Sequence, residues 1–314
     1  MTKVVEAKWQ GSEAAKIMPP ARRSVLTLLG VGLLQVCAAQ ASAAPTGPPL
    51  YVTERHGAKV YIMGLAGPGS GSSDWCTPAI KSALLSAQEF WQETPATPPT
   101  SDPALMQKLS MRDRGSLFDG MSAADADRLV RVARPAGITA EQQARMRPWY
   151  AATTIQFAAH NPLGKPGGPS QQARPPEMVL LSIAEAAHIP VRSEIAQWDD
   201  FPRFMAGLPE KAQYQYVAYQ LDQLDRGAGE AARMDAEWAR GDLRSYEATA
   251  DDMRKRYPDM FVGINAARNG RWADRIETML AAGACTSSAS DFSTPWGLTA
   301  SRRNFGAADC PFIA

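Results

Sequence analysis

Short β-prone runs alternate with helical periodicities from residue 50 onward. Residues 50–52, 60–63, 89–92 and 189–192 are rich in apolar, β-branched or aromatic side chains and end at turn residues, which predicts strands. Residues 74–85 have helical spacing, so they complete a strand–loop–helix–strand unit with the second and third of these runs. Ligands usually bind at loops that follow the carboxyl ends of such strands. We therefore expect functional side chains directly after the strands.

Helical periodicity dominates the rest of the chain. A helical insertion is predicted over residues 101–159, and further helices over residues 177–187, 211–225, 230–240 and 265–282. Residues 283–314 show neither a strand period nor a helix period, which predicts an irregular tail. The predicted fold class is therefore α/β, with a small central β-sheet flanked by many helices and helix-rich overall.

The first 43 residues have the layout of a cleaved export signal. Arg22 and Arg23 precede an apolar run over residues 25–36, and small residues at 39–44 would allow cleavage after Ala43. The paired arginines are compatible with a twin-arginine signal or with an ordinary charged region, and both possibilities stay open.

The mature chain is then residues 44–314, expected to form a single domain. Residues 1–17 would be an upstream extension if Met18 starts the signal. The apolar run before the cleavage site is too short to cross a bilayer comfortably, so the mature chain is expected to have no transmembrane segment. The predicted location is periplasmic or secreted.

Composition narrows the class of partner. The chain has 314 residues, of which 45% are hydrophobic and 21% charged, as in ordinary globular proteins. Its formal net charge is only +1, so there is no basic surplus to bind phosphate backbones. We therefore expect no nucleic acid as partner, and a small molecule or a peptide instead.

Three cysteines remain in the predicted mature chain, namely Cys76, Cys285 and Cys310. Export to an oxidising compartment would permit one disulfide and leave one thiol over. The preferred pair is Cys285 with Cys310, because both lie in the tail predicted to be irregular; the alternative is three unpaired cysteines. No cysteine and histidine spacing indicates a zinc site.

Several local patterns occur together in one order along the chain. They are Ala-x-Glu-x-x-x-Glu at residues 87–93, Pro-Trp at 148–149, a small residue followed by Glu at 193–194, Trp-x-x-Gly-Asp at 238–242 and Arg-Asn-x-x-Trp at 268–272. In this order they resemble the TraB/GumN family, which is related to Tiki-type proteins, over about residues 50–280. The resemblance implies a metal-dependent hydrolase, proposed as a peptidase, whose ligands include the histidines of two Gly-x-x-His motifs.

Both of those motifs are missing here. Gly67 stands where the first histidine is expected, in the segment 64–67. Thr286 stands at the second, in the segment 283–286, and no histidine follows His188. Neither a glycine nor a threonine replaces a neutral imidazole as a metal ligand. We therefore expect a divergent, catalytically degenerate member of that family.

Three residues remain as the candidate catalytic site: Glu93, Glu194 and Arg268. Each glutamate follows a predicted strand, so the two carboxylates would lie on one edge of the sheet if those strands are parallel. Two carboxylates there are suited to a hard divalent cation. Arg268 would instead neutralise them and form a buried pair that joins the last long helix to the sheet, which is the interpretation we favour.

The remaining histidines offer no better site. His56, His160 and His188 fall in a turn, at a helix end and before a strand, where surface or capping roles are typical. The sequence thus predicts an exported protein with a binding or structural role in the cell envelope. The alternative is a metal-dependent, peptidase-like hydrolase with a carboxylate metal site, and only that alternative requires a divalent metal.

Overall fold

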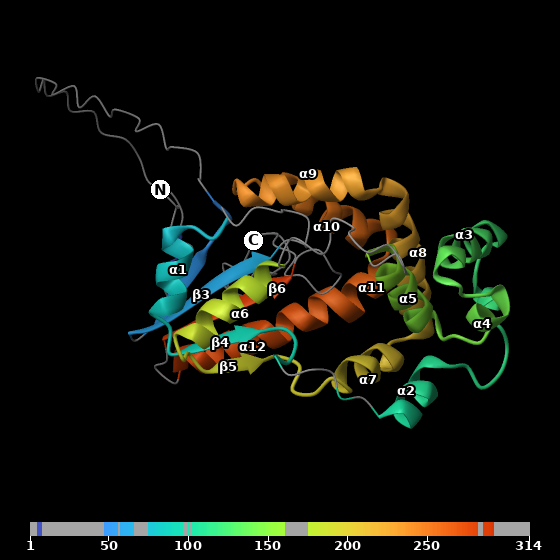
Figure 1. Cartoon of the computed structure of the whole chain (residues 1–314), viewed down its shortest axis with the longest axis horizontal. Helices are drawn as coiled ribbons and strands as arrows, with labels where there is room; N and C mark the ends of the chain where they lie inside the picture. Colours follow the sequence, from blue (N-terminus) through green and yellow to red (C-terminus); the bar gives the residue numbers. More distant parts are fainter. Residues whose placement is uncertain are drawn as a thin grey trace, which may run out of the picture.

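A six-stranded sheet lies at one end of the molecule and a group of helices at the other (Figure 1). The structure is a computed structural model, and it describes residues 5–7, 47–55, 57–65, 75–96, 100, 102–160, 175–281 and 285–291. The strands, in spatial order, are β1 (Val5–Ala7), β2 (Tyr51–Arg55), β3 (Ala58–Leu65), β6 (Cys285–Asp291), β4 (Glu89–Gln92) and β5 (Val191–Ser193).

Strand direction decides which residues share an edge of the sheet. β2 and β3 form an antiparallel hairpin, in which Gly57 adopts a φ of 82° that favours glycine. β3, β6, β4 and β5 run parallel to one another. The carboxyl ends of these four strands therefore meet at one edge, which we call the rim.

Helices make up most of the described chain. The α-helices are α1 (Pro78–Leu85), α2 (Pro103–Ser110), α3 (Ala123–Ala133), α4 (Ala140–Ala144), α5 (Pro148–His160), α6 (Pro176–Ala186), α7 (Asp200–Gly207), α8 (Glu210–Arg226), α9 (Ala228–Ala239), α10 (Arg244–Arg256), α11 (Pro258–Met260) and α12 (Ala267–Ala281). Shorter turns are the 3-10 helices η2 (Leu117–Gly120) and η3 (Arg134–Ala136) and the π-helical turn η5 (Phe261–Ala266). The predicted helix-rich α/β fold is confirmed.

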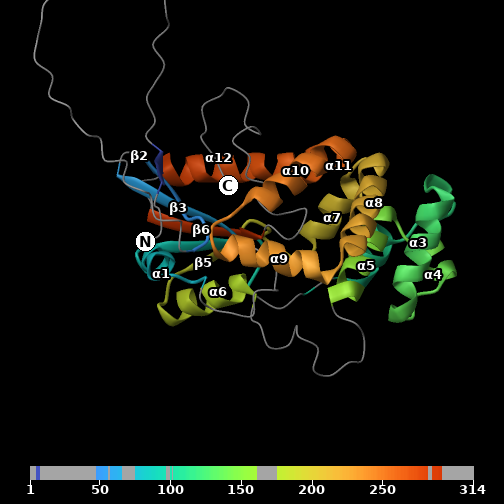
Figure 2. The same ribbon diagram turned by 90° about the horizontal axis from the view of Figure 1, so that it is seen from above.

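The sheet is covered on both faces, with α12 on one side and α1 and α6 on the other (Figure 2). Alternation along β3 explains this: Val60 and Ile62 pack against α12, whereas Met63 and Leu65 pack towards α1 and α6. On α12 the apolar positions recur with helical spacing at Trp272, Ile276, Met279 and Leu280. A sheet buried on both faces is typical of parallel strands.

A second core lies in the helical half, where α3, α5, α7 and α8 pack together. Trp149, Ile155, Met205 and Tyr216 are among its buried side chains. Helices α2, α3 and α4 lie on the side of this half that is farthest from the sheet (Figure 1). Among the described helices, none is both long enough and apolar enough to cross a bilayer.

Local chemistry sets several helix ends. Thr77 caps α1, since its Oγ1 accepts a hydrogen bond from the Ile80 amide at 3.3 Å, and Pro78 suits the first helical position. The helix therefore begins later than the predicted residue 74. Ser122 caps α3 in the same way by accepting from the Asp125 amide at 3.1 Å.

The prediction of an irregular tail from residue 283 is wrong for β6. Residues Cys285–Asp291 form a strand between β3 and β4, with Thr286 opposite Val60 and also opposite Glu89. Its sequence, Cys-Thr-Ser-Ser-Ala-Ser-Asp, has only one β-branched residue, Thr286, and no large apolar or aromatic residue to signal a strand. Backbone hydrogen bonding to strands on both sides holds this segment in the sheet. Such long-range pairing cannot be recognised from the local sequence.

One strand boundary differs from expectation, and one strand lies in a segment where none was predicted. The strand predicted from residue 189 begins at Val191, because Ile189 packs into the core beside α6 and Pro190 has no amide hydrogen to donate. β1 lies in the predicted export segment and pairs with β2. Cleavage after Ala43 would remove it and leave β2 at the edge, so cleavage remains a prediction that this pairing does not test.

Candidate functional site

The loops after β4 and β5 bring two glutamates to the rim. Glu93 directly follows β4, and Glu194 directly follows β5. The amide of Glu194 donates to the Gln92 carbonyl at 2.9 Å, and the amide of Ile195 donates to the Glu93 carbonyl at 3.0 Å. Parallel pairing thus continues past both strands and fixes the two loops side by side.

Arg268, near the start of α12, lies between the two carboxylates. Its Nη2 is 2.7 Å from Glu93 Oε2, and its Nε is 3.1 Å from Glu194 Oε2. The Arg268 side chain is only 1% exposed, and the glutamate side chains are 12% and 9% exposed. The structure therefore brings together all three residues of the predicted site, although it does not test a catalytic role for them.

Arg271, one turn further along α12, completes the group. Its Nε lies 3.0 Å from Glu194 Oε1, and its side chain is 46% exposed. We call Glu93, Glu194, Arg268 and Arg271 the rim cluster. Two carboxylates and two guanidinium groups balance formally, so each buried charge has an opposite charge within hydrogen-bonding distance.

A small cavity adjoins the exposed side of the rim cluster. Its volume is about 220 Å³, and its walls combine charged cluster residues with Ile195 and with Asp200, Phe201 and Phe204 of α7. The Arg271 guanidinium carbon stands 5.1 Å from the centre of the Phe204 ring, a cation–π arrangement. The cavity thus offers aromatic surface and both signs of charge to a small ligand.

A row of buried polar groups follows helical spacing from η5 into α12, the helix that carries Arg268, and sequence reasoning missed it. Asn265 lies in the π-helical turn η5 and is 0% exposed, yet neither amide atom has a hydrogen-bond partner in the part of the chain that the structure describes. Asn269 Oδ1 and Trp272 Nε1, four and seven residues on, are buried without a partner in the same sense. Such groups are rare in native proteins and, like π-helical turns, often mark functional positions.

Of the two positions where the family has a Gly-x-x-His histidine, the structure describes only the second. Gly67 lies outside the described residues. Thr286 lies at the amino end of β6, opposite Glu89, and therefore on the edge away from the rim. The residue at the rim end of β6 is Asp291, in register with Leu65. Asp291 was missed because its segment was predicted to be irregular. The one sequence signal that could have pointed to it is an acidic residue at the end of a strand, and that strand was not predicted.

His188 does not belong to the rim cluster. His188 is an exposed turn residue after α6 with a φ of 55°. His160 is the last residue of α5, and His56 lies outside the described residues.

Cys76 is a free cysteine, and burial raises the pKa of its thiol. The predicted pairing of Cys285 with Cys310 cannot be followed, because Cys310 is not among the described residues.

Comparison with known protein families identifies the chain. The model of the TraB/PrgY/gumN family matches residues 49–286, from just before β2 to the start of β6. The chain belongs to the TraB/PrgY/gumN family. The resemblance noted from the sequence patterns is thereby confirmed. Searches of the curated proteins and of the solved structures found no match.

Two of the patterns that carried this resemblance lie at structural contacts. The Trp238 side chain is 0% exposed, and its Nε1 donates to the Gly64 carbonyl near the end of β3 at 2.9 Å. Trp149 Nε1 donates to the Leu109 carbonyl at 3.0 Å and so ties α5 to the end of α2. These tryptophans stabilise the fold, whereas the glutamates and Arg268 gather at the rim.

The described residues of this family member do not fit the metal that the family resemblance implies. Among described side chains, no group of three or more His, Cys, Asp or Glu could hold a metal ion. Both rim carboxylates already bind Arg268. A divalent cation would meet the positive charge of Arg268 and Arg271 there, which disfavours it.

Proposed function

We propose that this chain is an exported TraB/PrgY/gumN-family protein that has lost catalysis and keeps a binding or structural role in the cell envelope. The observation that carries this proposal is the position of Arg268, buried between Glu93 and Glu194 and within 2.7 Å and 3.1 Å of their oxygens. Carboxylates paired with a buried arginine in this way join a helix to the rim of a sheet.

The cavity beside the cluster supports a binding role. Its volume of about 220 Å³ suits a side chain or a small molecule, and Phe201 and Phe204 provide apolar contact. Arg271 and Asp200 at the same cavity would bind polar ends of either charge. The partner proposed is therefore a peptide or a small molecule, and the near-neutral chain makes nucleic acid an unsuitable one.

Export is the second component of the proposal. The twelve-residue apolar run after Arg22 and Arg23 supports it, together with the small residues before Ala44. Fractionation of expressing cells should recover mature protein outside the cytoplasm, in the periplasm or the medium, with its amino terminus near Ala44. Recovery of the full-length chain from the cytoplasm would contradict this component.

The loss of catalysis is tested by metal analysis and by an assay. Purified mature protein should contain no stoichiometric zinc, manganese or cobalt, and it should not cleave a peptide panel when these metals are added. Glu93→Ala is the matched variant. Metal-dependent cleavage that Glu93→Ala abolishes would contradict the proposal.

A second candidate function is a metal-dependent, peptidase-like hydrolase with a carboxylate metal site. Asp291 favours it, because the register of β6 brings a third carboxylate residue to the rim, on the strand beside β4. Oxygen ligands of this kind are suited to hard divalent cations. Stoichiometric metal that both Asp291→Asn and Glu93→Ala remove would support this candidate over the first.

A further inference from the structure

A second cavity lies in the helical half and shares no lining residue with the rim cavity. Its volume is about 430 Å³, which is within the usual range for small-molecule sites. Three arginines line it, Arg112, Arg114 and Arg147, together with the acidic residues Asp113 and Glu210. We call it the arginine cavity.

The fold brings these arginines together through a short pairing of two segments. Met111 after α2 and Met146 before α5 form an isolated antiparallel bridge. On either side of it, the Arg112 amide donates to the Arg145 carbonyl at 2.8 Å, and the Arg147 amide donates to the Ser110 carbonyl at 2.7 Å. The chain thereby fixes the backbone of two of the three arginines.

Among the described contacts, the Arg112 guanidinium group donates side-chain hydrogen bonds through Nη1 alone. Its Nη1 donates to Glu210 Oε1 at 2.8 Å and reaches the Tyr214 hydroxyl at 3.5 Å. Its Nε is buried and has no hydrogen-bond partner within the described ranges. The edge formed by Nε and Nη2 is one with which arginine binds the two oxygens of a phosphate or carboxylate group in parallel. This edge has no protein acceptor at Nε.

The electrostatics of the cavity favour an anion. Three guanidinium groups face two carboxylates, which leaves one positive charge in excess. Helices α5 and α8 both begin at the cavity, at Pro148 and Glu210, and helix amino termini carry partial positive charge. Arg114 adds an exposed guanidinium that has no hydrogen bond or ion pair to the described part of the chain. Its charge is therefore available to a ligand.

We infer that the arginine cavity binds the phosphate group of a small organic phosphate. A phosphate dianion can accept from several guanidinium groups at once, and the cavity has space for an organic part beside it. The inference is independent of the function proposed for the rim, because it uses none of the same residues.

Titration of the mature protein tests this inference. Inorganic phosphate and glycerol 3-phosphate would be added at constant ionic strength, with arginine Nε–Hε signals followed by NMR and affinities measured by calorimetry. We expect saturable shifts of the Arg112 and Arg147 signals with both phosphates. Acetate at the same concentrations should produce weaker, non-saturating shifts. Absence of saturable phosphate binding, or equal binding of acetate, would overturn the inference.

Two variants of opposite charge change sharpen the test. Arg114→Gln removes an exposed guanidinium with no contact in the described structure, and it should weaken phosphate binding by about fivefold or more. Glu210→Gln removes the carboxylate that competes for Arg112, and it should tighten binding about threefold. Arg244→Gln, an 87% exposed arginine that binds Asp242 elsewhere, is the matched control and should leave affinity unchanged. Unchanged affinity in Arg114→Gln, or no tightening in Glu210→Gln, would overturn the assignment.

Discussion

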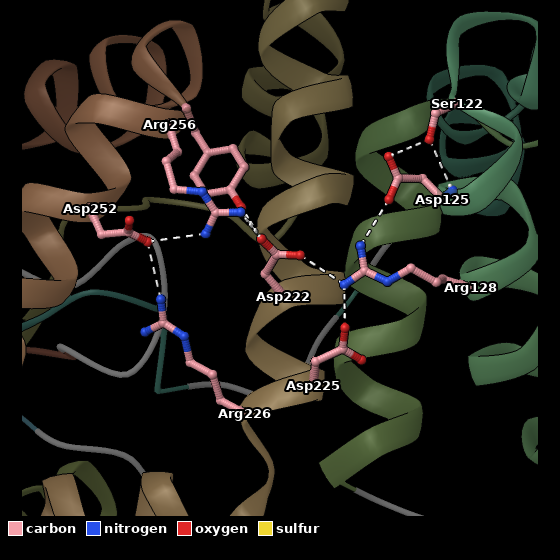
Figure 3. A network of polar contacts seen from close by, with 9 residues as sticks. Ser122, Asp125, Arg128, Asp222, Asp225, Arg226, Asp252 and Arg256 are labelled. Atoms are coloured by element: carbon pink, nitrogen blue, oxygen red, sulfur yellow. Dashed lines mark hydrogen bonds and ion pairs between the residues drawn. The ribbon is translucent and has the colours of Figure 1, made fainter.

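Two groups of arginines and carboxylates join distant parts of this chain, and they differ in burial and in redundancy. In the rim cluster, Arg268 is 1% exposed and both glutamates are at most 12% exposed. In the helical half, Arg128 of α3 binds Asp125, Asp222 and Asp225, with exposures from 19% to 66% among these four side chains (Figure 3). The same chemical groups therefore form ion pairs in a buried site and in a site that is open to solvent.

The helical network distributes its contacts over many partners. Asp222 of α8 accepts from Arg128, from Arg256 of α10 and from the Tyr257 hydroxyl, and Asp252 accepts from Arg226 at 3.1 Å (Figure 3). Loss of one group leaves the others paired and in contact with water. In the rim cluster, loss of Arg268 removes the ion pair of Glu93 with that residue and weakens the neutralisation of Glu194. Redundancy should make the network tolerant of substitution, and burial should make the rim sensitive.

The largest effect is expected for Arg268→Met. Removal of one partner from a buried ion pair typically costs about 3–5 kcal/mol, because the opposite charge stays buried. We expect a loss of that size in the free energy of unfolding, measured by urea denaturation followed by tryptophan fluorescence. Arg271→Met is the matched control; because that side chain is 46% exposed, its loss should be at most about 1 kcal/mol.

A charge-removing rescue distinguishes this cause from poor packing. In the Arg268→Met background, Glu93→Gln and Glu194→Gln together remove the two carboxylate charges that Arg268 neutralised. Most of the lost stability should return if electrostatics is the cause. An equal loss in Arg268→Met and Arg271→Met, or no recovery in the triple variant, would show that the burial of Arg268 does not set its contribution to stability.

The next effect concerns the buried amide beside the rim. Asn265→Leu replaces a 0% exposed group that has no hydrogen-bond partner in the described structure with an apolar side chain of similar size. An unsatisfied buried polar group costs about 1–3 kcal/mol, so this variant should gain about 1–2 kcal/mol in unfolding free energy. Asn269→Leu should gain less, because only its Oδ1 is buried without a partner. A loss of stability in Asn265→Leu would show that its amide is satisfied after all.

Sequence reasoning found Glu93, Glu194 and Arg268 of the rim cluster, but not Arg271, the buried polar row or the strand β6. Glu93 and Glu194 were predictable because each follows a short β-prone run, and parallel strands end on one edge. β6 was not, since its small polar residues give no local strand signal and its order comes from two neighbouring strands. Asn265 was missed because its burial depends on the tertiary packing around η5, which residue spacing alone does not reveal.

A smaller, pH-dependent effect is expected for Asp222→Asn in the helical network. Partial burial opposes ionisation, but hydrogen bonds from Tyr257, Arg128 and Arg256 outweigh it and hold the pKa of Asp222 below its ordinary value. A lowered carboxyl pKa contributes stability that is present above the unfolded value, about 4, and is lost as pH falls through the folded pKa. At pH 7 we expect Asp222→Asn to lose about 1 kcal/mol.

Unfolding measured from pH 7 to pH 2 checks this sign. The difference between wild type and Asp222→Asn should be constant above about pH 5 and should shrink as the pH falls below the unfolded pKa of about 4. A difference that grows on acidification would mean that the pKa of Asp222 is raised in the folded protein.

The smallest effect is the response of each region to salt. It tests only how far dissolved ions screen the charge pairs of the rim cluster and of the helical network. The Debye length falls from about 10 Å at 0.1 M salt to about 3 Å at 1 M, but only water-exposed charges are screened in this way. Double-mutant cycles on Arg128 and Asp225, whose carboxylate is 66% exposed, should give a coupling of a few tenths of a kcal/mol that vanishes at 1 M sodium chloride. The same cycles on Arg268 and Glu194 should retain most of their coupling, because neither side chain exceeds 9% exposure. If both couplings fell together, water would reach the rim cluster, and the buried pairing that supports a non-catalytic role would have to be given up.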